Sequence, residues 1–172
     1  MNDMYRLKSR LVALSLGVLC LSAHALDVGQ SLPSFNWEKM GGGGLSPADL
    51  KGSVVYVDFW ASWCGPCKHS FPWMNDMQAK YGDKGLKIIA VNLDQKMADA
   101  QAFLKGTPAS FTVAFDSKGE SPRKFGVKGM PSSYLVGPDG RVVLVHSGFR
   151  HDDGAELEAL IQDALKGAGG SK

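Results

Sequence analysis

VVYVDFWASWCGPC, residues 54–67, is the stretch of this 172-residue chain that decides its fold. Apart from Asp58, Val54 to Trp60 form a run of β-branched and aromatic residues, too short for a helix of its own and typical of a strand covered on both faces. Gly65 and Pro66 then end the strand, and Pro66 suits a first helical turn because the amide that it lacks would have no partner there. We therefore predict a buried strand that delivers two cysteines to the start of a helix.

The two cysteines are Cys64 and Cys67. A cysteine at a helix N-terminus meets free N–H groups and the positive end of the helix dipole, and both favour the reactive thiolate of Cys64. Cys67 lies one helical turn further on the same face, where its sulfur can reach that of Cys64. This spacing predicts a redox-active disulfide in which Cys64 attacks a substrate disulfide and Cys67 resolves the mixed disulfide.

The flanks of the cysteines resemble a known family. Residues 57–67 resemble the active-site strand and motif of thioredoxins, and FWASWC, residues 59–64, resembles more closely the exported TlpA/ResA-like thiol-disulfide reductases. The resemblance implies an α/β fold of thioredoxin type: a mixed central sheet with helices on both faces, an N-terminal hairpin and an extra strand-helix insertion before a cis proline. It also implies that Trp63, Gly65 and Pro66 contact the substrate.

GMPSSYLV, residues 129–136, is the second informative stretch. A proline that opens a strand cannot donate to the sheet, and it suits a cis peptide bond in a tight connection. In the thioredoxin fold the matching proline is cis and faces the dithiol, so the resemblance gives this role to Pro131. It leaves the backbone of Met130 to pair with an incoming substrate chain. The alternative is an ordinary proline at the start of a strand.

Asp58 is a carboxylate within the otherwise apolar predicted strand. Burying it ionised is costly, so we expect its pKa to rise and the group to shuttle a proton. Thioredoxins resemble this chain in carrying an acid at the same offset, behind the second cysteine, which implies that Asp58 exchanges the proton that frees Cys67 for attack. The alternative is a solvated or capping aspartate.

The rest of the chain alternates predicted strands and helices, which indicates an α/β sheet. Before residue 54, the four glycines 41–44 predict a turn, and Ser46 with Pro47 predicts the start of a short helix. Asp153 and Glu156 match a capping box at the start of the last helix. Beyond residue 67 we expect helices at 67–81, 98–104, 122–125 and from 153 onward, and strands at 86–91, 111–115 and 141–146.

The first 25 residues have the features of a signal peptide. Arg6, Lys8 and Arg10 precede an apolar run over 11–21, and the segment ends in Ala-His-Ala at 23–25. We predict cleavage after Ala25, which leaves a thioredoxin-like domain over residues 26–172, and a periplasmic location. The alternative is an uncleaved membrane anchor, although a membrane-spanning helix needs about 20 apolar residues.

Charge and composition exclude a nucleic-acid-binding function. The chain has 19 Lys and Arg against 17 Asp and Glu, and residues 1–25 hold three of the basic residues and one of the acidic ones. Without that segment the balance is 16 against 16, which provides no basic field for nucleic acid or anionic lipid. We expect a monomer that needs no cofactor and no metal.

Metal binding and peroxide chemistry are the alternatives to disulfide exchange. Zinc needs two ligands beyond the cysteines, and His69 is near without a fourth candidate beside it. A copper-binding chaperone would use the dithiol with His69, Met74 or Met77, although methionines at helical spacing more often fill a core. A resemblance to peroxiredoxins would require a Thr-x-x-Cys pattern. This chain has Ala61 at the position of that threonine.

The predicted function is protein disulfide reduction outside the cytoplasm. The partners that we expect are a disulfide-bearing protein substrate and a membrane thiol electron donor that resets the pair. The reducing direction is implied by the dipeptide Gly65-Pro66, which resembles reducing members of the family. The cytochrome c maturation branch remains an alternative; it typically has Glu straight after the cis proline, where this chain has Ser132.

Overall fold

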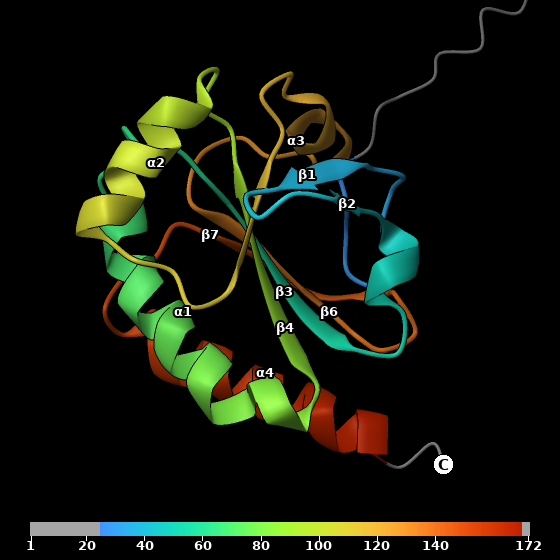
Figure 1. Cartoon of the computed structure of the whole chain (residues 1–172). Helices are drawn as coiled ribbons and strands as arrows, with labels where there is room; N and C mark the ends of the chain where they lie inside the picture. The colour runs from blue at the N-terminus through green and yellow to red at the C-terminus, as the bar shows by residue number, and fades with distance from the viewer. Residues whose placement is uncertain (1–24, 170–172) are drawn as a thin grey trace, which may run out of the picture.

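A seven-stranded mixed sheet forms the centre of the computed structural model, which describes residues 25–169 (Figure 1). The strand order is β2-β1-β5-β4-β3-β6-β7. The strands are β1 (Trp37–Lys39), β2 (Gly44–Leu45), β3 (Val54–Trp60), β4 (Leu86–Asn92), β5 (Thr112–Phe115), β6 (Ser132–Val136) and β7 (Val142–Ser147). The helices are α1 (Cys67–Tyr81), α2 (Met97–Gly106), α3 (Glu120–Phe125) and α4 (Asp153–Gly169), with short 3₁₀ helices η1 (Pro47–Leu50) and η2 (Gly82–Lys84).

β3 lies at the centre of the sheet, as its sequence predicts. All seven of its residues are buried. It pairs in parallel with β4 and antiparallel with β6. Because both edges of β3 are hydrogen-bonded and both faces are covered, its C-terminal end is a fixed platform for the residues that follow.

Helices cover both faces of the sheet, which confirms the predicted fold class. On one face, Phe71, Met74 and Met77 of α1 and Ile161 of α4 pack against alternate residues of β3 and β4. On the other face, α3 and η1 cover the sheet through Phe125 and Leu50. Since each buried side chain of this size contributes about 1.5–3 kcal/mol, these two apolar layers hold the sheet in place.

The predicted insertion and N-terminal hairpin are both present. α2 and β5 form the extra unit between α1 and the proline loop, and β5 lies between β4 and β1. β1 and β2 pair antiparallel across the glycine run, where Gly42 and Gly43 have φ angles of 87° and 84°. Only glycine adopts such angles without strain, so the glycines suit this tight reversal.

The predicted caps had different outcomes. Ser46 and Pro47 begin η1 as expected, with the Ser46 N–H donating to Asp49 at 2.8 Å. The capping box at Asp153 is wrong, because Asp153 already lies in α4 and its carboxylate accepts from the Arg150 N–H at 2.7 Å. The cap of α4 is therefore formed three residues earlier than the sequence pattern indicates.

Apart from Ala25, the predicted signal peptide lies outside the described residues. None of the helices formed by residues 25–169 combines the length and the hydrophobicity that a membrane crossing needs.

Candidate active site

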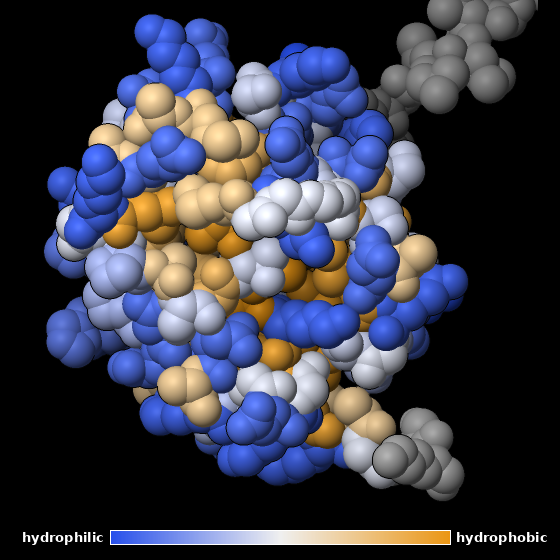
Figure 2. Space-filling model, viewed as in Figure 1, coloured by the Kyte–Doolittle hydropathy of each residue, from blue (hydrophilic) through white to orange (hydrophobic). Residues whose placement is uncertain are grey.

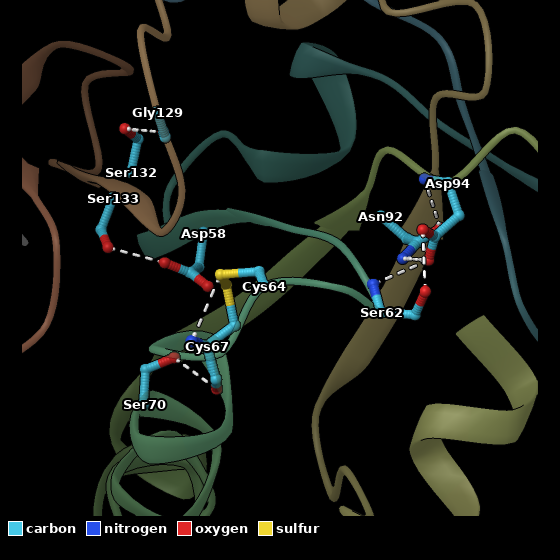
Figure 3. Close-up of a disulfide and its surroundings, with 10 residues drawn as sticks. All are labelled: Asp58, Ser62, Cys64, Cys67, Ser70, Asn92, Asp94, Gly129, Ser132 and Ser133. Atoms are coloured by element: carbon cyan, nitrogen blue, oxygen red, sulfur yellow. Dashed lines mark hydrogen bonds between the residues drawn. A yellow bond between two sulfur atoms is a disulfide. The ribbon is translucent and has the colours of Figure 1, made fainter. Parts of the chain in front are cut away.

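The segment between β3 and α1 presents the cysteines, and β4 holds it in place (Figure 3). The carboxylate of Asp94, just beyond β4, accepts hydrogen bonds from the Ser62 N–H at 2.9 Å and the Ser62 hydroxyl at 3.0 Å. The amide of Asn92 donates to the same carboxylate at 2.8 Å. Asp94 is 4% exposed, so these bonds are shielded from water. No sequence pattern predicted this cluster.

Cys64 and Cys67 form the predicted disulfide, with an S–S distance of 2.00 Å and a Cα–Cα distance of 5.4 Å. Cys64 is 4% exposed and Cys67 is completely buried. Helix α1 begins at Cys67, so Cys64 lies three residues before the helix and not at its first residue. The Cys67 N–H nevertheless donates to the Cys64 sulfur at 3.3 Å. The backbone therefore stabilises negative charge on the more accessible of the two sulfurs.

An open groove of about 500 Å³ passes the Cys64 side of the disulfide. All the residues predicted to contact substrate line it, with Trp63 exposed to 73% at its rim. The groove is lined by the predicted Trp63, Cys64, Gly65, Pro66 and Met130, and by Leu93, Pro122, Val127, Lys128 and Gly129. In the second group, Leu93 follows β4, Pro122 lies in α3 and the other three follow α3. No local pattern reveals that these segments approach the cysteines.

The peptide bond between Met130 and Pro131 is cis, as predicted. The carbonyl of Pro131 accepts from the Gly148 N–H at 2.8 Å, and the Ser132 hydroxyl donates to the Gly129 carbonyl at 2.7 Å. These bonds fix the proline loop from both sides. Met130 faces the groove with Cys64, which places the loop opposite the disulfide.

Asp58 is completely buried within β3, in register with Ala90 on β4 and Ser133 on β6. Its Oδ1 accepts from the Ser133 hydroxyl at 2.7 Å. Figure 3 shows the Asp58 carboxyl between Ser133 and the disulfide. Burial raises the pKa of Asp58 to about 7, and the hydrogen bond from Ser133 opposes this rise. The expected direction of the pKa change is confirmed, and the solvated or capping alternative is wrong.

The geometry removes part of the support for copper binding. Met74 and Met77 are 0% and 1% exposed and pack in the core beneath α1, so both side chains fill the core, as methionines at helical spacing more often do. Within residues 25–169, no group of three or more His, Cys, Asp or Glu side chains is arranged to hold a metal ion. His69 is exposed on the first turn of α1.

A separate apolar hollow lies away from the cysteines. Figure 2 shows apolar side chains gathered over the face that carries α2 and the β1–β2 hairpin. The hollow is lined chiefly by Met40, Leu104, Pro108, Ala109, Phe111 and Val113. Neither cysteine and no polar group of the site lines it, so it is not part of the candidate active site.

Comparison with protein families matches residues 28–145 to the AhpC/TSA family. The chain is 32% identical over 141 residues to the thiol-disulfide oxidoreductase ResA of Bacillus subtilis, covering 82% of this chain and 75% of that protein. It is 35% identical over 118 residues to the ResA of Bacillus cereus, covering 69% of this chain and 68% of that one.

Solved structures are similar over most of the chain. A putative thiol:disulfide interchange protein DsbE from Chlorobium tepidum is 55% identical, with a TM-score of 0.79, covering 82% of this chain and 99% of that one. A putative protein disulfide isomerase from Bacteroides thetaiotaomicron is 25% identical, with a TM-score of 0.76, covering 82% and 91%. The expected thioredoxin-like fold and its disulfide chemistry are thereby confirmed.

Proposed function

Because this chain belongs to the AhpC/TSA family and is a thiol-disulfide oxidoreductase of thioredoxin-like fold, we propose that it reduces protein disulfides outside the cytoplasm. The observation that carries the proposal is the asymmetry of the pair: Cys64 reaches the groove, whereas Cys67 is completely buried. This asymmetry supports Cys64 as the sulfur that attacks a substrate and Cys67 as the sulfur that attacks Cys64 from within.

The reaction begins with the reduced pair. The thiolate of Cys64 attacks one sulfur of a substrate disulfide, a mixed disulfide forms, and the second substrate sulfur leaves as a thiolate. Cys67 passes its proton to the carboxylate of Asp58 and attacks the Cys64 sulfur. The Cys64–Cys67 disulfide forms, and the first substrate sulfur leaves with the electron pair. The substrate is reduced by two electrons and the enzyme is oxidised by two.

The lining of the groove supports the proposal that the substrate is a protein chain in extended conformation. Trp63, Gly65 and Pro66 form one wall, and the loop carrying Met130 forms the facing one. In our proposal the backbone of Met130 pairs with the substrate chain, and Pro131 keeps that loop opposite Cys64. The wide exposure of Trp63 suits a residue that is covered only when a partner binds.

We also propose where the protein is located and how its cysteines are reduced again after each reaction. The basic and apolar start of the chain, followed by Ala-His-Ala at 23–25, supports export with cleavage after Ala25. A monomeric periplasmic protein would then receive electrons from a membrane thiol donor. Mass spectrometry of the protein recovered from the periplasm tests this: a chain starting at Leu26 is expected, and an intact membrane-bound chain would contradict cleavage.

Trapping the mixed disulfide tests the function as a whole. A Cys67→Ser protein attacks substrate but cannot resolve the adduct, so we expect it to remain joined to partner proteins through Cys64. The matched control, Cys64→Ser, keeps the buried cysteine and should trap nothing. Release of the adducts by a reductant identifies the substrates. Equal trapping by both variants, or by neither, would contradict the assigned roles.

A further inference from the structure

The carboxyl of Asp58 is held from one side only. Its neighbour on β4 is Ala90, which has no polar side chain, and its neighbour on β6 is Ser133. The Ser133 hydroxyl donates to Asp58 Oδ1 at 2.7 Å, and the two residues are 2% and 0% exposed. A hydrogen bond from a hydroxyl to a carboxylate is short and strengthened by the charge, more so where water is excluded.

The second oxygen of Asp58 is in a different situation. Among residues 25–169, Oδ2 is buried without a hydrogen-bond partner. Such an oxygen is costly to leave unpaired in a folded protein and calls for an explanation. Figure 3 shows the carboxyl turned with one oxygen toward Ser133 and the other toward the disulfide. The free oxygen is therefore on the side of the carboxyl that the disulfide occupies.

We propose that Ser133 is a positioning residue for the proton transfer, fixing Oδ1 of Asp58 so that Oδ2 faces Cys67 and favouring the ionised carboxylate that accepts the proton. The inference rests on the proposed role of Asp58. It assigns to a serine on β6 a part in the chemistry of a dithiol on α1. Ser133 touches no reacting sulfur and acts through the carboxyl that it holds.

Other titratable groups surround this pair without replacing Ser133. On β3 itself, the pKa of Tyr56 is raised by burial and by the charge of Asp58. On β7, His146 lies opposite Ser133, and its Nε2 is 3.2 Å from Oδ2 of Asp153 at the start of α4. The pKa of Asp153 is lowered mainly by the hydrogen bond from the Arg150 backbone. None of these groups donates a hydrogen bond to Asp58, which accepts from Ser133.

The experiment compares Ser133→Ala with the parent protein, both with reduced cysteines. In protein labelled with ¹³C-aspartate, the Asp58 carboxyl signal is identified by its loss in Asp58→Asn and titrated by NMR. Removing the hydroxyl destabilises the carboxylate, so we expect its midpoint to rise by about one pH unit or more. The rate of insulin disulfide reduction should then need a correspondingly higher pH, with about a tenfold loss below the midpoint.

Three variants control for packing and folding. Ser133→Thr and Ser133→Val have equal shape and differ in the hydroxyl, so only the valine variant should reproduce the shift, whatever the alanine variant does to stability. Ser121→Ala removes a buried hydroxyl that donates to the carboxylate of Asp116. It should leave the pH profile unchanged. A His146→Gln background removes the imidazole that lies opposite Ser133 on β7.

The outcomes separate the two proposals. An unchanged Asp58 midpoint in Ser133→Ala and Ser133→Val overturns the role of Ser133. A raised midpoint with an unchanged rate profile supports Ser133 as the group that sets the state of Asp58, but removes Asp58 from the proton transfer. A raised midpoint with a matching shift of the rate profile, restored by Ser133→Thr, supports both.

Discussion

The backbone N–H of Cys67 points at the sulfur of Cys64, with 3.3 Å between the two atoms. The second cysteine of the pair thus contributes to the environment of the first before any electron is transferred. The N–H comes from the first residue of α1, where the helix dipole adds to its effect. A thiolate on Cys64 is therefore stabilised by backbone atoms that a side-chain substitution at position 67 leaves in place.

This contact predicts selective alkylation of the reduced protein. Cys64 should react with iodoacetamide with a midpoint below the free value of about 8.5, because the N–H stabilises its thiolate. Cys67, which is completely buried, should be protected. Peptide mass spectrometry over a pH series measures both rates, with urea-unfolded protein as the control in which the difference disappears. Faster labelling of Cys67 than of Cys64 would contradict the assignment.

Asp58→Asn should slow the release of reduced substrate. The amide keeps the shape of the side chain and an oxygen for the Ser133 hydroxyl, but it cannot accept the proton of Cys67. Loss of a positioned acid-base group typically costs about 10²–10⁴ in rate, and we expect at least the lower part of that range near pH 7. Stopped-flow fluorescence of substrate release measures it. Release at the parental rate across the pH range would remove the proton-transfer role.

The same substitution should stabilise the fold at neutral pH. The pKa of Asp58 rises from 3.8 to about 7 on folding because the carboxyl is buried, so the folded state disfavours the ionised form. The folded protein therefore loses stability as the pH rises from about 4 to about 7, by about 4 kcal/mol in total.

Urea unfolding of the oxidised proteins checks this expectation. Asp58→Asn should exceed the parent in stability at pH 8 and lose most of that advantage at pH 3, where Asp58 is largely protonated in both folded and unfolded chains. A difference that is the same at both pH values would mean that the charge of Asp58 is not its cause. This pH dependence is opposite to that expected for a carboxylate in an ion pair, because removing such a carboxylate destabilises the fold most at neutral pH.

Local sequence patterns were sufficient for the frame of the site. A run of seven residues, apolar except for Asp58, marks β3, and the proline before β6 marks the cis bond, because each depends on residues adjacent in the chain. The predicted helix over 67–81 agrees with α1, although Cys64, expected at the helix N-terminus, lies three residues before its first residue. Helix ends are decided by single hydrogen bonds, as the unexpected cap at Arg150 also shows.

The supporting residues of the site were not predictable in the same way. Ser133 meets Asp58 across 75 residues of sequence, and Asp94 meets Ser62 across 32. A serine within a strand and an aspartate after one are common and carry no signal by themselves. Their roles depend on which strands become neighbours and in which register, and these are properties of the folded sheet. A polar residue inside a predicted buried strand is the one sequence clue that such a partner exists.

Asp94 should be needed for both stability and activity. Asp94→Ala leaves the Ser62 N–H, the Ser62 hydroxyl and the Asn92 amide without their acceptor, and each buried unpaired group costs about 1–3 kcal/mol. The segment before Cys64 would loosen, so we expect lower stability in urea and slower insulin reduction by the remaining folded protein. Asp49→Ala is the matched control, because Asp49 also accepts from a serine N–H but caps the exposed η1. It should leave the rate unchanged.

The redox potential decides in which direction the enzyme runs. A potential close to the reducing value of thioredoxin, about −270 mV, is expected for Gly65-Pro66 between the cysteines, whereas a strong periplasmic oxidant lies near −120 mV. For a two-electron couple this gap of about 150 mV is about five powers of ten in the equilibrium constant, so the two cases are readily separated.

Equilibration of the purified protein with glutathione or dithiothreitol buffers, followed by tryptophan fluorescence or thiol trapping, gives the value. Since Trp63 precedes Cys64 and Trp60 ends β3, the fluorescence is expected to respond to the state of the pair. A potential near that of the oxidant would reverse the proposed direction while leaving the exchange chemistry and the roles of the two cysteines intact.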